Sequence, residues 1–192
     1  FSMYFEFNPE SISQNHEWCK NQNNCLVPIF IFGIKNPWFI ISLNSIDELK
    51  SYIGKITGTS PWIEVTQERI NEFAKATEDY QWIHLDEAKA KQGPFGTTIA
   101  HGFLTLSLAP WMGYNTYEVK NIAHSVNYGL DRVRFLSPVK AGSKVKGSYK
   151  LLEVEEFKGS GYRIKNELTI EIENEERPAC IAQTIGVLYP EE

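Results

Sequence analysis

The sequence is poor in cysteine, and the cysteines it has follow no familiar pattern. Cys19, Cys25 and Cys180 form an odd, sparse set, which excludes the disulfide framework typical of small secreted domains. Cys19 and Cys25 lie near His16, but their spacing fits no common zinc pattern and no second Cys/His pair follows. We therefore expect reduced thiols in a cytoplasmic protein, and no metal site.

The chain also lacks a long apolar run and an excess of positive charge. Its most apolar stretch, Leu26 to Ile41, is shorter than the roughly 20 residues of a membrane span and is interrupted by Pro28, Lys35 and Pro37. It lacks the basic start and small-residue cleavage site of a signal peptide. The formal net charge of -5 gives no reason to expect nucleic acid. These absences predict a globular protein with neither membrane nor nucleic acid as a partner.

A length of 192 residues is typical of one domain with or without an appendage. The composition changes near Asn44, so we predict an N-terminal extension of unassigned role over residues 1–43 and a folded domain over residues 44–192. The extension runs from polar, Asn/Gln/Ser-rich sequence into an aromatic and β-branched stretch. It could form an edge strand with an irregular arm, or pack on a partner subunit.

The first half of the domain carries helix signals. Ser45 followed by Glu48 is a capping box and predicts a short helix. Thr66 is the predicted N-cap of a helix of about three turns, because apolar residues follow it at helical spacing. Residues 79–86 are predicted to be a loop, and Asp86 is predicted to cap another short helix.

Asp79 and His84 are the candidate reactive pair. On an α-helix their separation corresponds to a rotation of about 140°, so they would not share a face, but in a loop they can converge. A carboxylate and a neutral histidine aimed at one water make a workable acid–base pair, because histidine titrates near neutral pH. Trp82 and Ile83 between them supply apolar cover. The alternative is a chance pairing, in which Asp79 ends the preceding helix and His84 is a satisfied core histidine.

Residues 101–109 predict a second feature of interest, a helix that is apolar nearly all round, buried on most sides and closed by Pro110. Gly102 permits close approach to the free backbone N–H groups at the helix start. Such a start suits a carbonyl oxygen that acquires negative charge, and one such donor is worth about 3 kcal/mol to a transition state. The alternatives are plain helix-start geometry for Gly102, capping or packing for His101, and a silent small residue at Ser107.

Strand signals dominate after Asn121. Apolar and charged residues alternate in three segments, which predicts an antiparallel sheet with one solvated face: 145–151, 162–172 and 181–189. A shorter strand is expected over residues 59–65, and Gly159-Ser160-Gly161 is a predicted hairpin turn. Together with the apolar helix, this pattern predicts an α+β fold in which a long antiparallel sheet wraps around a central hydrophobic helix.

Two sequence runs, residues 79–86 and 93–108, closely resemble the MaoC-like dehydratase family and its branch named after nodulation protein N. Shorter runs that match the same branch follow at residues 127–135, 137–139, 141–143 and 178–180. The likeness covers about Ser45 to Tyr189, and residues 1–43 lie outside it.

The resemblance implies a single hot-dog fold and a homodimer. It also implies a hydro-lyase of fatty acid metabolism that adds or removes water across a trans-2-enoyl thioester, as (R)-specific enoyl-CoA hydratases and 3-hydroxyacyl dehydratases do. No cofactor or metal is then required, because coenzyme A or acyl-carrier protein arrives as part of the substrate.

The resemblance assigns three catalytic residues. Asp79 and His84 fall on the pair that activates water, and Gly102 falls on the residue whose N–H receives the thioester carbonyl. A hot-dog thioesterase is an alternative, with similar binding and a different path for the water. A non-catalytic acyl-thioester-binding subunit is another, because a fold alone does not fix a function.

The resemblance also suggests substrate contacts. Ser107 matches a serine that lines the family's site, and His101 and Phe103 flank Gly102. Gln81 stands where the hydratases have Asn, and Trp82 where they often have Pro. A bulky Trp82 is expected to shorten or reshape the acyl tunnel.

Overall fold

The structure is a computed structural model, and it describes residues 40–191 of the chain. Predictions for residues 1–39, which include most of the N-terminal extension, Cys19 and Cys25, lie outside the described residues. Among the helices of residues 40–191, none is both long and apolar enough to cross a membrane.

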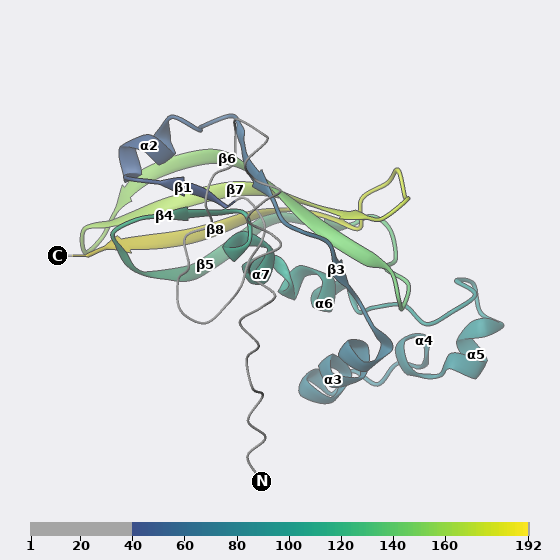
Figure 1. Cartoon of the computed structure of the whole chain (residues 1–192). Coiled ribbons are helices and arrows are strands. Elements are labelled where there is room, and N and C mark those ends of the chain that lie inside the picture. Colours follow the sequence, from purple (N-terminus) through teal and green to yellow (C-terminus); the bar gives the residue numbers. More distant parts are fainter. Residues whose placement is uncertain (1–39, 192) are drawn as a thin grey trace, which may run out of the picture. The chain divides into compact units, whose positions relative to one another are not determined.

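The centre of the fold is an antiparallel sheet, as the alternating sequence predicts (Figure 1). Its spatial order is β2, β6, β7, β8, β5, and the short β3 (Ile63–Glu64) pairs with β6 beside β2. The main strands are β2 (Ile56–Thr59), β5 (Ile122–Phe135), β6 (Lys144–Phe157), β7 (Gly161–Ile172) and β8 (Cys180–Pro190). Buried and more exposed side chains alternate along β7, so the predicted division into an inner and an outer face is confirmed.

Two details of the strands differ from or refine the predictions. The strand predicted over residues 59–65 is split into β2 and β3 around Pro61, which has no N–H to donate to a neighbouring strand. The predicted hairpin turn between β6 and β7 is confirmed: three residues, 158–160, separate the strands, and Gly159 and Ser160 have positive φ there (67° and 59°).

A second, smaller sheet lies at the edge of the domain. It pairs β1 (Ile41–Leu43) with β4 (Tyr117–Val119) in parallel. Leu43 is fully buried, and it packs with Leu49, Leu151, Ile164 and Leu188. Strand β1 is therefore part of the folded unit, which starts a few residues before the boundary placed at Asn44.

Three helices begin at the side-chain caps that the sequence predicts. They are α2 (Ile46–Lys50), α3 (Gln67–Thr77) and α5 (Glu87–Lys91). Ser45, Thr66 and Asp86 each accept a hydrogen bond from a first-turn N–H, at 3.1, 3.2 and 2.9 Å. Helix α3 ends at Glu78 in the left-handed conformation (φ 60°), so the chain turns sharply just before Asp79.

The prediction of a loop over residues 79–86 is wrong in part, because Trp82–Leu85 form the one-turn helix α4. The N–H of Ile99 donates to the carbonyl of Ile83 (3.1 Å), and the side chain of Gln67 donates to the carbonyl of His84 (2.8 Å). Residues distant in sequence therefore hold this turn, and no local signal predicts it.

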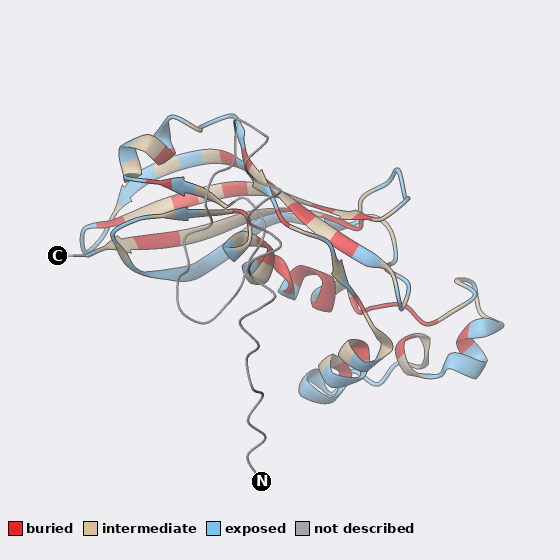
Figure 2. Cartoon of the chain, in the orientation of Figure 1, coloured by how far each residue is buried: buried red, intermediate tan, exposed pale blue. Residues whose placement is uncertain are grey.

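The central helix is two helices in succession, α6 (Gly102–Ser107) and α7 (Ala109–Tyr114), which pack against one face of the sheet (Figures 1 and 2). Pro110 was predicted to close a single helix. It instead lies in the first turn of α7, where proline removes no hydrogen bond because the N–H would have no partner. The rest of the sequence pattern holds, since Leu104 and Met112 are buried in the core.

The central helices are buried on most sides, as predicted, but one side of them is exposed. Four exposed residues follow one another at helical spacing: Phe103, Ser107, Pro110 and Tyr114. Phe103 is 68% exposed. We call these four residues the exposed stripe. It runs along both helices, from the start of α6 to the end of α7.

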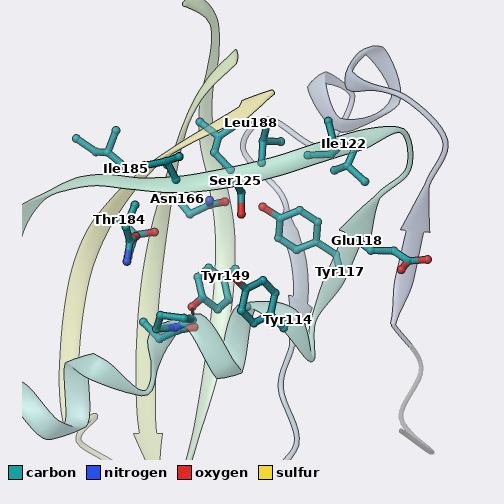
Figure 3. A pocket seen from close by; sticks show the side chains of 18 of the residues that line it. Tyr114, Tyr117, Glu118, Ile122, Ser125, Tyr149, Asn166, Thr184, Ile185 and Leu188 are labelled. Carbon is teal, nitrogen blue, oxygen red and sulfur yellow. Dashed lines mark hydrogen bonds between the residues drawn. The ribbon is translucent and has the colours of Figure 1, made fainter. Parts of the chain in front are cut away.

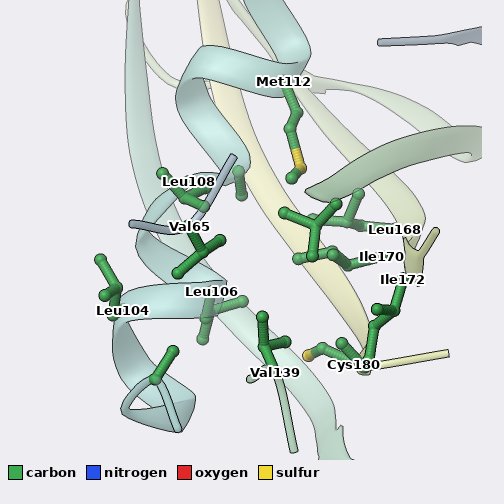
Figure 4. Packing of buried hydrophobic residues seen from close by; sticks show 14 of the residues in the cluster. Val65, Leu104, Leu106, Leu108, Met112, Val139, Leu168, Ile170, Ile172 and Cys180 are labelled. Carbon is green, nitrogen blue, oxygen red and sulfur yellow. The ribbon is translucent and has the colours of Figure 1, made fainter. Parts of the chain in front are cut away.

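The main core lies between the central helices and the sheet (Figure 4). Gly147 of β6 permits the closest contact there, because a Cβ at this position would lie 2.7 Å from Met112 Sδ. Cys180 of β8 is fully buried in the same cluster, and burial raises the pKa of its thiol to about 11. The core thus fixes α7 tightly against β6.

Candidate active site

The structure brings Asp79, His84 and His101 together. A carboxylate oxygen of Asp79 and one ring nitrogen from each histidine all lie within 4.8 Å of one another. The two imidazole rings stack with their centroids 3.7 Å apart. Both histidines are buried, whereas the Asp79 side chain is 55% exposed. The carboxylate and histidine singled out in the sequence therefore meet at one point that solvent can reach.

Hydrogen bonding defines the protonation of His84. Its Nδ1 lies 2.7 Å from the carbonyl oxygen of Ile99, which can only accept, so Nδ1 carries the proton of the neutral ring. Nε2 then keeps its lone pair. Burial lowers the pKa of His84 below 6.5; the Ile99 hydrogen bond and Asp79 oppose this shift, whereas repulsion from His101 adds to it. His84 is thus prepared to act as a neutral base.

His101 connects the start of α6 to the reactive pair. Its Nε2 lies 3.0 Å from the carbonyl oxygen of Asp79 and 4.0 Å from the Asp79 carboxylate. The opposite nitrogen, Nδ1, is buried and has no hydrogen-bond partner among the residues that the structure describes. His101 does not line the pocket beside His84, so its position suits holding the Asp79 backbone better than the predicted substrate contact.

Gln67 is a functional candidate that the sequence analysis missed. Its amide nitrogen donates to the His84 carbonyl and to Asn71 Oδ1, both at 2.8 Å. Its amide oxygen accepts from the hydroxyl of the buried Thr98, at 2.5 Å. One side chain thereby joins α3, the turn that carries His84 and the segment that leads to Gly102. Its place next to the cap Thr66 gives no sign of this role.

A pocket of about 320 Å³ lies beside His84 and Gly102, and residues 135–139 form another of its walls. Gly102 is the first residue of α6, so its N–H has no partner within the helix. A Cβ at this position would lie 3.0 Å from the Phe135 ring, so glycine is needed for the ring to pack so closely. Gly102, with its free N–H, and His84 therefore border the same small volume.

The other predicted substrate contacts lie outside this pocket. Gln81 is exposed and precedes α4, while Trp82 packs under the Lys89 ammonium, 4.6 Å from its ring centroid. Neither lines the pocket beside His84. Phe103 and Ser107 lie on the exposed stripe, which starts next to Gly102. Only an acyl chain lying along α6 would reach them.

The same three side chains could in principle share a metal ion, because each offers a suitable atom. One nitrogen of each histidine is already directed at a backbone carbonyl, which leaves His84 Nε2 and His101 Nδ1. We assign no ion to them, and the sequence-based expectation of a metal-free site stays a prediction.

Comparison with known proteins identifies relatives over most of the chain. Residues 48–172, which include every residue of the candidate site, match the protein family described as MaoC like domain. The 3-hydroxyacyl-thioester dehydratase Z of Mycobacterium tuberculosis is 43% identical over 144 residues, which are 75% of this chain and 95% of that protein. Nodulation protein N of Rhizobium leguminosarum is 47% identical over 147 residues, which are 75% of this chain and 91% of that protein. An unliganded R-hydratase from Pseudomonas aeruginosa has a similar fold, with a TM-score of 0.56 at 21% identity over 73% of this chain and 83% of that one.

Proposed function

The chain belongs to the family of MaoC-like domains, and on that premise we propose that it is a hydro-lyase acting on a trans-2-enoyl thioester. The hot-dog fold and the likeness to nodulation protein N that its motifs predict are both confirmed. The names of its relatives support chemistry of the dehydratase or hydratase kind. The observation that carries the proposal is the convergence of the Asp79 carboxylate and the His84 ring beside the Gly102 pocket.

In the hydration direction, His84 Nε2 and the Asp79 carboxylate bind one water molecule. They remove a proton from it as its oxygen forms a bond to the β-carbon of the substrate. The electrons of the double bond move toward the thioester carbonyl, whose oxygen becomes an enolate that the Gly102 N–H stabilises. The proton is then returned to the α-carbon, so that one water has been added. Dehydration is the reverse sequence.

In this proposal the thioester carrier is part of the substrate. Coenzyme A or acyl-carrier protein carries the acyl group, and no separate cofactor takes part. The thioester occupies the pocket beside Gly102, and the acyl chain leaves it along the exposed stripe, where Phe103 and Ser107 contact it. We place this reaction in the cytoplasm and in fatty acid metabolism, as the sequence analysis expects.

A second copy of the chain completes the proposed assembly. Strand β5 lies at the edge of the sheet, and within residues 40–191 only β8 pairs with it. It is 14 residues long and exposes apolar side chains, among them Val126, Tyr128 and Leu130. A long exposed edge of this kind invites pairing with another strand. A homodimer joined through β5 would cover it, and sedimentation equilibrium of the parent and of Leu130→Lys tests this.

Hydration of crotonyl-CoA, followed by loss of the enoyl-thioester absorbance, tests the proposed chemistry. We expect turnover by the parent and a loss of about 10²–10⁴-fold in Asp79→Asn and in His84→Ala, because each removes half of the acid–base pair. Unchanged melting temperatures would show that the variants are folded. Release of free thiol would identify a thioesterase instead. Tight thioester binding without turnover, unaffected by Asp79→Asn, would identify a binding subunit.

A further inference from the structure

A chamber of about 640 Å³ lies at the α7 end of the central helices, away from Gly102 (Figure 3). Its helical wall is formed by residues of α7: Ala109, Pro110, Gly113 and Tyr114. Strands β5, β7 and β8 contribute to the other walls. Most of its lining is apolar, including Val119, Ile122, Ile164, Ile185 and Leu188. Neither Asp79 nor His84 lines it, so the chamber is separate from the candidate reactive centre.

Polar side chains also line the chamber (Glu118, His124, Ser125, Asn127, Thr184 and Asn166), and among these only Asn166 is buried. Asn166 is in the inward register of β7 between Ile164 and Leu168, and it is only 4% exposed. Its side chain lies beside the Tyr117 hydroxyl, and Oδ1 has no hydrogen-bond partner in the described part of the chain. Figure 3 shows the Asn166 amide, the Tyr117 hydroxyl and the Ser125 hydroxyl directed toward one another. An unpaired buried amide oxygen is destabilising, so a ligand that donates a hydrogen bond to it gains affinity.

The exposed stripe connects this chamber to the reactive centre. The stripe begins at Phe103, next to Gly102, and ends at Pro110 and Tyr114, which are chamber residues. At about 1.5 Å per helical residue, it is roughly 16 Å long, a length that an extended acyl chain can follow. A chain attached to a thioester at Gly102 would therefore bring its far end to the chamber.

We propose that the chamber receives the distal end of the substrate's acyl chain and that Asn166 selects chains with a hydroxyl group at that end. This rests on the function proposed above and specifies its substrate class. A hydroxyl both donates and accepts, so it satisfies the Asn166 amide in either orientation about its last bond. A methyl group would leave Asn166 Oδ1 buried and unpaired, and such a mismatch discriminates strongly between substrates.

The test compares ω-hydroxydodecenoyl-CoA with dodecenoyl-CoA in the parent and in Asn166→Leu, with kcat/KM as the measured quantity. The parent prefers the hydroxylated chain. The ratio of kcat/KM for the hydroxylated chain to kcat/KM for the plain chain falls by about tenfold or more in Asn166→Leu, because the leucine side chain pairs with a methyl end and not with a hydroxyl. Thr169→Val, a change of similar kind on the same strand but outside the chamber, leaves the ratio as in the parent.

Two outcomes separate this inference from the proposed function. Turnover of crotonyl-CoA together with a parent ratio equal to that of Asn166→Leu overturns the chamber assignment alone. Absence of turnover with every thioester overturns the proposed function. If Asn166→Leu does not fold, calorimetric binding of saturated ω-hydroxydodecanoyl-CoA and dodecanoyl-CoA to the parent decides: tighter binding of the hydroxylated thioester supports the inference, and equal or weaker binding contradicts it.

Discussion

The two ends of the central helices each bury one polar atom without a hydrogen-bond partner among the described residues, yet they are built differently. At the α6 end the atom is His101 Nδ1, within a group of side chains held by hydrogen bonds to backbone carbonyls. At the α7 end it is Asn166 Oδ1, in a largely apolar chamber, and the packing of Met112 on Gly147 fixes α7 itself. The first end preserves the positions of particular atoms, and the second preserves a volume. Changes at the first should reduce the reaction rate, whereas changes at the second should reduce stability or alter substrate choice.

Gln67→Leu should have the largest effect of the substitutions that avoid the reactive pair. It removes the donor to the His84 carbonyl and the acceptor for the Thr98 hydroxyl. A small displacement of a catalytic group can cost about a hundredfold in rate, so we expect kcat for crotonyl-CoA to fall by about that factor. KM should change much less, because Gln67 does not line the pocket.

Three further variants show whether Gln67 acts by positioning. Asn71→Ala removes its exposed third hydrogen bond and should keep the parent rate. Thr98→Ser keeps the hydroxyl and should stay near the parent, whereas Thr98→Val should resemble Gln67→Leu. A decrease in melting temperature with an unchanged kcat in Gln67→Leu would contradict the positioning role.

Gly147→Ala probes the opposite end and should act on stability. The added methyl group would lie 2.7 Å from Met112 Sδ and 3.0 Å from Leu168 Cδ1, so the Met112 side chain or α7 must shift. Overpacking of this kind costs about 1–3 kcal/mol in the free energy of unfolding, which urea denaturation measures. Gly113→Ala is the matched control on α7, where the nearest atom is 3.5 Å away. It should leave stability unchanged or raise it by up to about 1 kcal/mol, because alanine favours helix.

The difference between the two ends also explains what the sequence could predict. The caps at Ser45, Thr66 and Asp86 and the alternating strands depend on neighbouring residues, and each was predicted correctly. The turn at Trp82–Leu85 is held by hydrogen bonds from Ile99 and from Gln67, and Gln67 in turn accepts a hydrogen bond from Thr98. These partners are distant in sequence, so no local pattern reveals the turn or the role of Gln67. Their correct placement requires the tertiary structure.

Asn166 is a different case, because a signal was present. It occupies the inward register of a strand whose other inward residues are apolar, and a polar residue at such a position is either paired or functional. The exposed stripe was missed for the opposite reason. Phe103 and Pro110 are apolar, and hydrophobic character alone does not distinguish a buried surface from one that a ligand covers.

The smallest predicted effect is on the pH dependence of the free energy of unfolding. It arises at the α6 end, where His84 lies. Burial lowers the pKa of His84 below 6.5, so between pH 6.5 and that lower pKa the unfolded chain binds a proton that the folded chain does not. The free energy of unfolding should therefore decrease as the pH falls below 6.5, and the contribution should be complete above it. Hydration should persist below pH 6.5 for the same reason, since His84 stays neutral there.

His84→Gln provides the comparison for this prediction. Urea denaturation at a series of pH values should show a weaker decrease below pH 6.5 in His84→Gln than in the parent. Identical pH profiles for the two proteins would show that His84 is not the group responsible.

The buried thiol of Cys180 can report how often the sheet opens. With a pKa of about 11 and no exposed surface, it reacts with alkylating reagents only when β8 separates from its neighbours. Because β8 lies between β5 and β7, the alkylation rate of Cys180, followed by peptide mass spectrometry, reports how often the middle of the sheet opens. A ligand that binds only the closed sheet would lower the alkylation rate of Cys180 in proportion to the ligand's occupancy, whether or not the ligand is turned over.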